Sequence, residues 1–395
     1  MHVNINSELG ELEGAVVHTP GLEVEEMTPK TAKRALYSDI LNLSVARSEY
    51  IQLKGVLSGI CQCLEVTDLL ADILQEKTIR NSLVQDICKR EEATELISEL
   101  NELSAPELAR QLIQGVPIKR NTLSRYLSQE RFSLWPLHNF LFTRDAAMVW
   151  REQVIIGNMA NRIRKREARI MEAVFTHHPL LKTGILRAGD HEDTRRSRPL
   201  TIEGGDFLVA REDLLLIGTG NRTSTRGIDF ILEQVKNRKE GIQHILVQEL
   251  PEHPESFIHL DMVFTLLDRD TCMVYEPLIM HTNRFHTLHV QIEHGEVSRI
   301  TEEENLPKAL KKLGMDLKPV FCGGHRDPWI QEREQWHSGA NFFAVAPGQI
   351  IGYERNVHTV EELSNNGFEV IRAEEIINGK KEIPAKQKCV ITIAG

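Results

Sequence analysis

A few acidic residues, one histidine and one cysteine are the part of this sequence that could do chemistry. The carboxylates are Asp145, Glu203 and Asp261, and His259 lies two positions before the last of them. Cys389 opens a short β-branched run. Three carboxylates around one cavity would bind a cation, and a planar guanidinium with several N–H donors fits paired carboxylates best. We predict that the Cys389 thiol attacks the carbon of such a group while His259 moves protons.

Each of these positions also has a purely structural interpretation. Glu203 stands in Ile202-Glu-Gly-Gly-Asp206, where the glycines also suit a plain turn between strands. His259 and Asp261 would face the same side of a strand, and they could be a satisfied contact in the core. Asp145 follows an arginine, which is typical of a surface pair. The functional interpretation therefore depends on all of them meeting in one place.

The same carboxylates create a difficulty for the thiol. Negative neighbours raise the pKa of a cysteine, so Cys389 would rest in its protonated form. A bound guanidinium could lower that pKa and generate the nucleophile when the substrate is present. We treat this substrate-assisted ionisation of Cys389 as a hypothesis.

The remaining cysteines and glycine-rich stretches predict neither a metal nor a cofactor. Cys322 and His325 have a metal-like spacing, but no second pair with matching spacing follows. Cys61 and Cys63 are too close together for an ordinary zinc pair and are better explained as structural residues. The sequence contains no phosphate-binding loop and no dinucleotide fingerprint at a strand–helix junction.

An internal repeat is what would bring the polar residues together. Four segments each have an acidic or amide residue, an apolar strand, a tight turn and a second apolar strand. They span residues 145–157, 206–218, 261–275 and 341–352. Helical patterns follow three of them, at 159–174, 223–237 and 359–366, and residues 12–20 could supply a fifth copy. We expect a propeller-like ring with the polar residues facing a central pocket.

Residues 31–131 differ from the rest in character. They are poor in glycine and carry apolar residues at helical spacing, so we predict an all-helical subdomain inserted into the ring. Residues 1–30 and 132–395 would then form the catalytic α/β domain. The expected role of the helical part is packing or contact between subunits, and we expect a homo-oligomer.

The overall composition limits the class of protein. The chain has 395 residues, of which 41% are hydrophobic and 26% are charged, as is usual for a soluble globular protein. Its net charge of −10 argues against unspecific nucleic-acid binding, and its apolar runs are too short to span a bilayer. The first residues have no basic or apolar segment of a secretory signal. We therefore expect a cytoplasmic protein with reduced thiols.

These motifs, taken in this order, closely resemble those of the arginine deiminases within the guanidine-modifying superfamily. The resemblance covers nearly the whole chain. Its motifs are Ser7-Glu8-Leu9-Gly10, His18-Thr19-Pro20-Gly21, Leu36-Tyr37-Ser38-Asp39, Asn139-Phe-Leu-Phe-Thr-Arg-Asp145, Ile202-Glu-Gly-Gly-Asp206, His259-Leu-Asp261, Glu332-Arg-Glu-Gln-Trp336 and Ala346-Pro-Gly348. The resemblance implies a five-fold pseudosymmetric α/β propeller, the pentein fold, with an inserted all-helical subdomain.

The resemblance also implies roles for individual residues. Cys389 would form a covalent amidino intermediate, with His259 as general acid and base. The reaction would convert arginine and water to citrulline and ammonia without a metal or cofactor. The implied contacts to the substrate are Glu203, Asp145 and Asp261 on the guanidinium, Arg164 and Arg222 on the carboxylate, and Asn139 and Phe142 along the pocket wall.

One stretch departs from the family pattern. The family usually has an Arg- and Gly-rich loop before its cysteine, whereas residues 381–388 here contain neither residue type. Lys386 or Lys388 could replace the missing arginine as a point charge, or the substrate could be another guanidine. Two further interpretations stay open: an amidinotransferase, in which an amine receives the amidino group, and a relative that binds guanidines without turnover.

Overall fold

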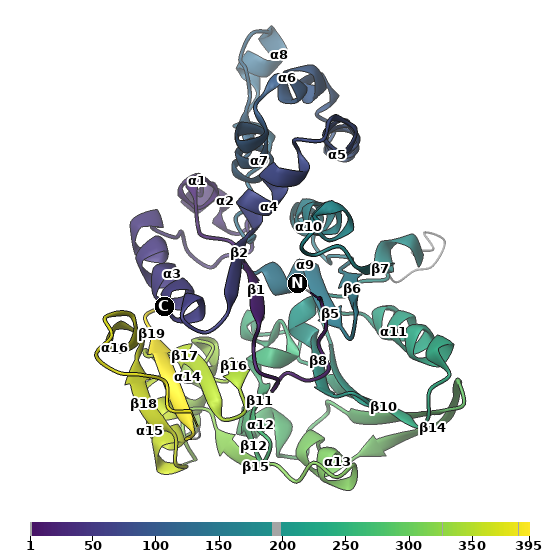
Figure 1. The fold of residues 1–395 in the computed structure, drawn as a ribbon, viewed down its shortest axis with the longest axis vertical. Helices are drawn as coiled ribbons and strands as arrows, with labels where there is room; N and C mark the ends of the chain where they lie inside the picture. Colours follow the sequence, from purple (N-terminus) through teal and green to yellow (C-terminus); the bar gives the residue numbers. More distant parts are fainter. Residues whose placement is uncertain (1, 192–198, 326, 386) are drawn as a thin grey trace.

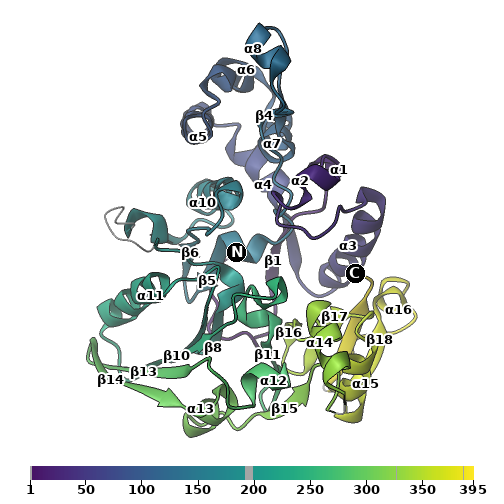
Figure 2. The same ribbon diagram turned by 180° about the vertical axis from the view of Figure 1, so that it is seen from behind.

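A computed structural model describes residues 2–191, 199–325, 327–385 and 387–395. The fold is mixed α/β, and small sheets surround a common middle while a group of helices projects to one side (Figures 1 and 2). Among the described residues no sheet closes on itself, so the sheets alone do not establish a five-fold propeller. No described helix has both the length and the apolar character needed to cross a membrane.

Four units share one strand pattern. In each, two antiparallel strands form a hairpin, and a later strand runs parallel to the second strand of the hairpin. The first three units are β5 (Ala147–Trp150), β6 (Gln153–Ile156) and β7 (Gly184–Arg187); β8 (Phe207–Arg211), β9 (Leu214–Thr219) and β10 (Gln243–Glu249); and β11 (Phe264–Asp268), β12 (Thr271–Val274) and β15 (Lys318–Phe321). The hairpins lie where the sequence repeat predicts them.

The second unit is extended and the fourth is rearranged. Strands β13 (Thr287–Glu293) and β14 (Glu296–Glu303) continue the sheet beyond β10. The fourth unit consists of β16 (Phe343–Ala346), β17 (Gln349–Tyr353), β18 (Glu369–Arg372) and β19 (Cys389–Ile393). Here β19 lies between β17 and β18 and is parallel to both, so β18 is displaced to the edge of the sheet. The turn of this hairpin uses Gly348 at φ +74°, a conformation that other residues rarely adopt.

A helix lies between the second strand of each unit and the parallel strand that follows it in the chain, which is β18 in the fourth unit. These helices are α10 (Lys165–His177), α11 (Thr225–Arg238), α13 (Leu306–Lys312) and α15 (Val357–Asn365). Helix α10 is amphipathic, and its residues Ile170, Met171 and Val174 are buried in the core. Three of these helices overlap the helical stretches that the sequence predicts, because apolar residues at this spacing must face a common core.

A fifth, incomplete unit lies near the amino terminus. Strand β1 (Gly14–Val17) pairs in parallel with β2 (Gln62–Glu65), and α3 (Leu43–Ser58) connects them. This matches the second strand, helix and third strand of the other units. Among the described residues β1 has no antiparallel partner, so the first strand of this unit is missing. Since β2 lies inside the stretch 31–131, that stretch is not purely helical as predicted, and part of it belongs to the α/β sheets.

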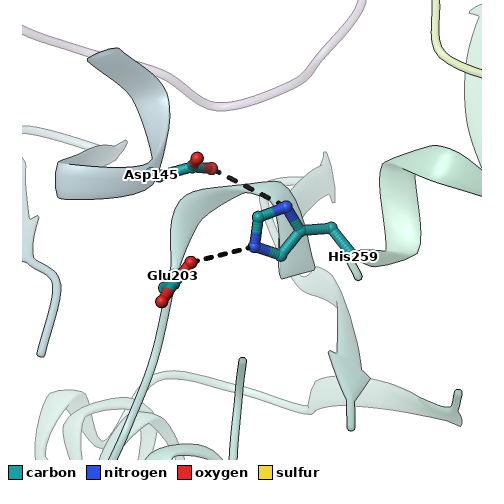
Figure 3. A group of neighbouring side chains, drawn as sticks. All are labelled: Asp145, Glu203 and His259. Carbon is teal, nitrogen blue, oxygen red and sulfur yellow. Dashed lines mark hydrogen bonds and ion pairs between the residues drawn. The ribbon is translucent and has the colours of Figure 1, made fainter. Parts of the chain in front are cut away.

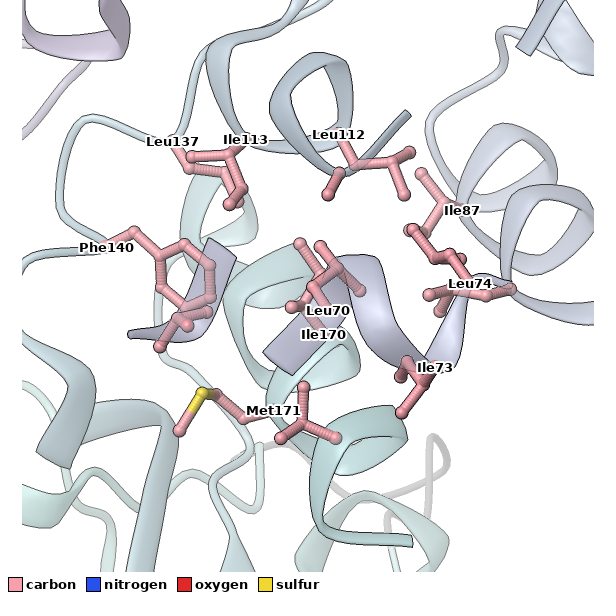
Figure 4. Packing of buried hydrophobic residues seen from close by; sticks show 14 of the residues in the cluster. Leu70, Ile73, Leu74, Ile87, Leu112, Ile113, Leu137, Phe140, Ile170 and Met171 are labelled. Carbon is pink, nitrogen blue, oxygen red and sulfur yellow. The ribbon is translucent and has the colours of Figure 1, made fainter. Parts of the chain in front are cut away.

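The helical projection shares its core with the first unit. It contains α4 (Val66–Ile73), α5 (Lys77–Arg90), α6 (Ile97–Glu102), α7 (Ala105–Gln114) and α8 (Leu123–Leu127). Figure 4 shows Leu70 of α4 and Leu112 of α7 packed in the same cluster as Ile170 and Met171 of α10. Helix α7 begins with a capping box, in which Ser104 and Glu107 satisfy each other's backbone N–H groups. The apolar core therefore continues across the predicted boundary between the two domains.

Because this core is continuous, a cavity in the projection should destabilise the whole protein. We expect Leu70→Ala to lower the free energy of unfolding by about 2–5 kcal/mol, since Leu70 is fully buried. Urea unfolding followed by circular dichroism measures the change. The matched control is Leu123→Ala, whose leucine is 75% exposed and should give a change below about 0.5 kcal/mol. Equal effects of the two substitutions would contradict a shared core.

Candidate active site

The side chains of Asp145, Glu203 and His259 lie next to one another in the interior (Figure 3). His259 Nε2 lies 3.2 Å from Glu203 Oε2, and His259 Nδ1 lies 3.8 Å from Asp145 Oδ1. All three side chains are buried, with exposures of 11%, 0% and 5% in the order of the sequence. Each residue precedes the first strand of a unit. The arrangement of these strands therefore positions the three side chains next to one another.

Short helical turns, and not strands, present these side chains. Asp145 lies in α9 (Thr143–Ala146), and His259 immediately precedes a 3₁₀ turn over Leu260–Met262. The expectation that His259 and Asp261 lie on one strand was therefore wrong. The backbone turns here because Asp206 Oδ1 accepts the N–H of Leu260 at 2.9 Å. A side chain at Gly205 would place its Cβ 2.4 Å from His259 Nδ1, so the glycine lets the imidazole approach.

Two arginines lie against the same carboxylates. Arg164 Nη1 is 2.7 Å from Asp145 Oδ2 and 3.7 Å from Glu203 Oε2, and Arg164 also pairs with Glu167 at 2.8 Å. Arg222 Nη1 lies 3.6 Å from Glu203 Oε2. Arg164 is buried, and its guanidinium is already engaged by acidic groups. Its expected role in holding a substrate carboxylate stays a prediction.

The other predicted residues lie around this network. The backbone carbonyls of Asn139 and Phe142 face Arg164 Nη2 at 3.4 and 3.5 Å. The side-chain amide of Asn139 donates to the carbonyl of Ala35, whereas the ring of Phe142 is exposed. Asp261 is partly exposed and accepts a hydrogen bond from the side chain of Asn341. The side chains of Arg164 and Arg222 thus join the acidic cluster, whereas Asn139 and Phe142 adjoin it only through their backbone carbonyls.

The electrostatics favour a charged imidazole. Burial lowers the pKa of His259, but the negative charges of Asp145, Glu203, Asp206 and Asp261 more than offset it and raise this pKa to about 10. Because the pKa in the unfolded chain is about 6.5, the ionised His259 contributes its full stability below that pH. The contribution is lost as the pH rises towards 10.

The carboxylates do not all behave alike. Burial raises the pKa of Asp145, but Arg164 and His259 outweigh it and hold this pKa below its usual range. Burial raises the pKa of Asp206 to about 7 and that of Asp261 to about 6, with partial compensation from His259. The site therefore contains fixed anions and carboxyl groups that exchange protons near neutral pH.

Ligand atoms of Asp145, Glu203 and His259 lie within 4.8 Å of one another, as in many metal sites. A metal ligand must offer the lone pair of a neutral imidazole nitrogen. Both nitrogens of His259 instead face carboxylates, which favours a proton on each. The donor set thus suits an imidazolium better than a metal ion.

Several supporting residues were not singled out from the sequence. Arg144 forms a bidentate ion pair with Glu8 and also donates hydrogen bonds to the carbonyls of Gly204 and Phe207. It therefore fixes the turn that carries Glu203. Glu167 lies three residues after Arg164 on the same helical turn, a spacing that predicts an ion pair. Burial raises the pKa of Glu167 to about 7.

Cys389 lies at the other end of the fourth unit. It pairs with Gln349 and Glu369, and its N–H donates to the carbonyl of Gly348 in the hairpin turn. Asn341, which contacts Asp261, lies just before the start of β16, at the end of the hairpin that is farther from the turn. The five residues from there to the turn span about 16 Å at roughly 3.3 Å per residue. The structure does not bring Cys389 to His259.

The surroundings of Cys389 are those of a structural thiol. It is fully buried, and burial together with Glu369 raises its pKa to about 11, while Lys381 acts in the opposite direction. Lys388 pairs with Asp268 and Asp270, so it does not extend to the acidic cluster. Lys386 lies outside the described residues. Within the described chain, no cysteine joins the group of ligand atoms formed by Asp145, Glu203 and His259.

The charged state of His259 can be tested through Asp145. We expect Asp145→Asn to lower the pKa of His259 by about 1–3 units, because it removes the carboxylate facing Nδ1. A pH titration of ¹⁵N-labelled imidazole signals by NMR measures both proteins. The imidazole signals of the exposed His358 supply an internal control and should be the same in both proteins. A wild-type pKa near 6.5 for His259 would contradict the electrostatic argument.

The chain resembles known proteins over most of its length. A sequence profile of the family described as arginine deiminase matches residues 33–379, a range that stops short of Cys389. The arginine deiminase of Listeria monocytogenes (strain EGD-e) is 29% identical over 383 residues, which cover 93% of this chain and 92% of that protein. The arginine deiminase of Bacillus cytotoxicus is 30% identical over 389 residues, covering 93% of each chain.

A solved structure also shares the fold. The chain AgrE, in its unliganded crystal structure, aligns with a TM-score of 0.50 at 12% identity and covers 96% of this chain and 36% of that one. At this identity the likeness concerns the fold alone. With a family profile over most of its length and a 30% identical relative across nearly all of both chains, the protein belongs to the arginine deiminase family.

Proposed function

We propose that the protein hydrolyses the guanidinium group of L-arginine to give L-citrulline and ammonia. As a member of the arginine deiminase family, it is a hydrolase that acts on C–N bonds. One observation supports the substrate class most directly. The guanidinium of Arg164 already lies 2.7 Å from Asp145 and 3.7 Å from Glu203, so the acidic cluster has the geometry that recognises this group.

The proposed proton transfers use His259. After a nucleophile has bonded to the guanidinium carbon, the imidazolium donates a proton to the amino group on that carbon, the C–N bond breaks and ammonia departs. The neutral imidazole then accepts a proton from the water that completes the ureido group. Asp145 and Glu203 stabilise the charged imidazole before the transfer, and Asp261, which is partly exposed, is positioned to bind a nitrogen of the incoming guanidinium.

The finer proposal is a covalent step through a thiol. In this step the thiolate sulfur bonds to the guanidinium carbon, ammonia leaves, and water then displaces the sulfur to give citrulline and the free thiol. Cys389 can serve only if β19 leaves its place between β17 and β18. Antiparallel pairing with the open edge of β1 would supply the missing first strand of the fifth unit. Cys389 would then occupy the position that Asp145 and Asn341 hold in their own units.

The fold proposal follows from the same units. Four hairpin-plus-strand units and an incomplete fifth would form a five-fold pseudosymmetric α/β propeller once the fifth unit gained its first strand. The helical projection at 66–127 would be an insertion into that ring. An antiparallel ladder on β1, observed in a crystal structure with a bound guanidine, would support this arrangement.

The acid–base role of His259 has a direct kinetic test. We expect His259→Gln to lower kcat for arginine by about 10²- to 10⁴-fold, because glutamine cannot transfer the proton. Ammonia and citrulline are assayed without added amine, so that an amidinotransferase would give no product. His358→Gln changes an exposed histidine in the same way and should keep wild-type rates. Full activity of the His259 variant would overturn the proposal.

The thiol needs an experiment of its own. If Cys389 is the nucleophile, Cys389→Ala abolishes turnover while arginine binding, measured by calorimetry, and the circular dichroism spectrum are retained. Cys272→Ala is the matched control, since this buried thiol lies in the middle of β12. Turnover by the Cys389 variant at the wild-type rate would remove this residue from the mechanism while leaving the role of His259 intact.

A further inference from the structure

A cavity lies between the helical projection and the first unit. Its volume is about 340 Å³, and residues of α5, of α10 and of the segment after β6 line it. Helix α10 lies beside both α5 and β7 (Figures 1 and 2). None of the residues that line this cavity was assigned a role in the acidic cluster around His259. The cavity is therefore a separate feature of the surface.

The lining of this cavity is strongly basic. Six basic side chains face three acidic ones, Glu91, Glu172 and Asp190. The basic residues are Arg90, Arg162, Lys165, Arg166, Arg169 and Arg187. Three of them, Arg90, Arg169 and Arg187, have close ion pairs with Asp86 or Glu172 and are largely neutralised. The remaining three basic residues are Arg162, Lys165 and Arg166, and they carry the excess positive charge of the lining.

Arg166 provides the clearest sign of a missing partner. Its side chain is 3% exposed, and it donates from Nη2 to the carbonyl of Trp135. Its Nε lies 3.4 Å from Glu91 without a hydrogen bond, and its Nη1 has no hydrogen-bond partner among the described residues. A buried guanidinium with unsatisfied N–H groups costs free energy unless a ligand accepts them. Arg166 is thus placed to hold an oxyanion.

Two exposed cations complete the arrangement. Lys165 precedes Arg166 and has no ion-pair partner among the described residues. Arg162 Nη2 donates to the carbonyl of Arg90 at 3.4 Å and lies 3.6 Å from the exposed Glu92. Both side chains are exposed, and these contacts of Arg162 are long, so both cations can turn towards a ligand. A buried guanidinium with two exposed cations at the rim is an arrangement that binds phosphate or carboxylate oxygens.

We propose that this cavity binds a small polyanion through phosphate or carboxylate groups. Arg166 donates hydrogen bonds to one oxyanion at the buried end, and Arg162 and Lys165 contact the other charges of the ligand. The site adjoins the acidic cluster, because Ala160, directly after the lining residue Met159, donates its N–H to Glu203 at 3.0 Å. The proposal does not depend on the reaction that the acidic cluster performs.

Calorimetric titration of the full chain tests the proposal with two probes, pyrophosphate for the phosphate class and citrate for the carboxylate class. We expect at least one probe to bind with a stoichiometry of one per chain. The double variant Arg162→Gln/Lys165→Gln should weaken that binding by about tenfold or more, because two charge-assisted contacts are lost. Both residues are exposed, so the variant should fold normally.

The controls separate this site from general charge effects. Arg333→Gln removes an exposed arginine from α14 (Pro328–Trp336) and should leave binding unchanged. Arg166→Gln should abolish binding, and circular dichroism checks that this buried substitution preserves the fold. Absence of binding by either probe at millimolar concentration, or equal affinity in the wild type and the double variant, would overturn the proposal. Since no substrate is present, these results are independent of the arginine assay.

Discussion

The rest of this structure depends on one buried charge, the imidazolium of His259 held between Asp145 and Glu203. An isolated charge in a protein interior is very unfavourable, so it persists only with well-placed partners of opposite sign. The three residues come from three different units, and each lies at a short helical turn that leads into the first strand of its unit. The ring-like placement of the units is therefore the condition under which the charge can be buried.

The supporting contacts show how that condition is met. Asp206 fixes the backbone next to His259, and the Arg144–Glu8 pair fixes the turn that carries Glu203. Arg164 and Arg222 balance the surplus of negative charge. These groups are mutually dependent, because removing one partner would leave a buried charge uncompensated. Such a network fixes one geometry of these side chains.

The sequence allowed much of this arrangement to be predicted. The hairpins follow from alternating apolar residues and turn residues, which are local signals. The convergence of Asp145, Glu203 and His259 follows from their places shortly before the first strands of three units. The local conformation at His259–Leu260–Asp261 was missed, because the hydrogen bond from the Leu260 N–H to the distant Asp206 decides it.

The position of Cys389 could not be predicted from the sequence. Its strand was predicted correctly, but the choice of neighbouring strands was not predictable from the run itself. A short β-branched segment can pair with any open strand edge, and in the structure β19 lies between β17 and β18, whereas the proposed mechanism needs it beside β1. The residue's chemistry depends on that choice, because the two placements put the thiol at opposite ends of a unit.

The shared core around α10 has a mechanical consequence. The segment that leads into this helix carries Arg164, which touches the acidic cluster, while the middle of the helix is packed against α4. A helix of 13 residues is about 20 Å long and nearly rigid. The helix would therefore tilt as one body about its contact with the apolar cluster. Any tilt of the projection, for example on contact with another molecule, would displace Arg164 relative to Asp145 and so link a remote surface to the centre of the protein.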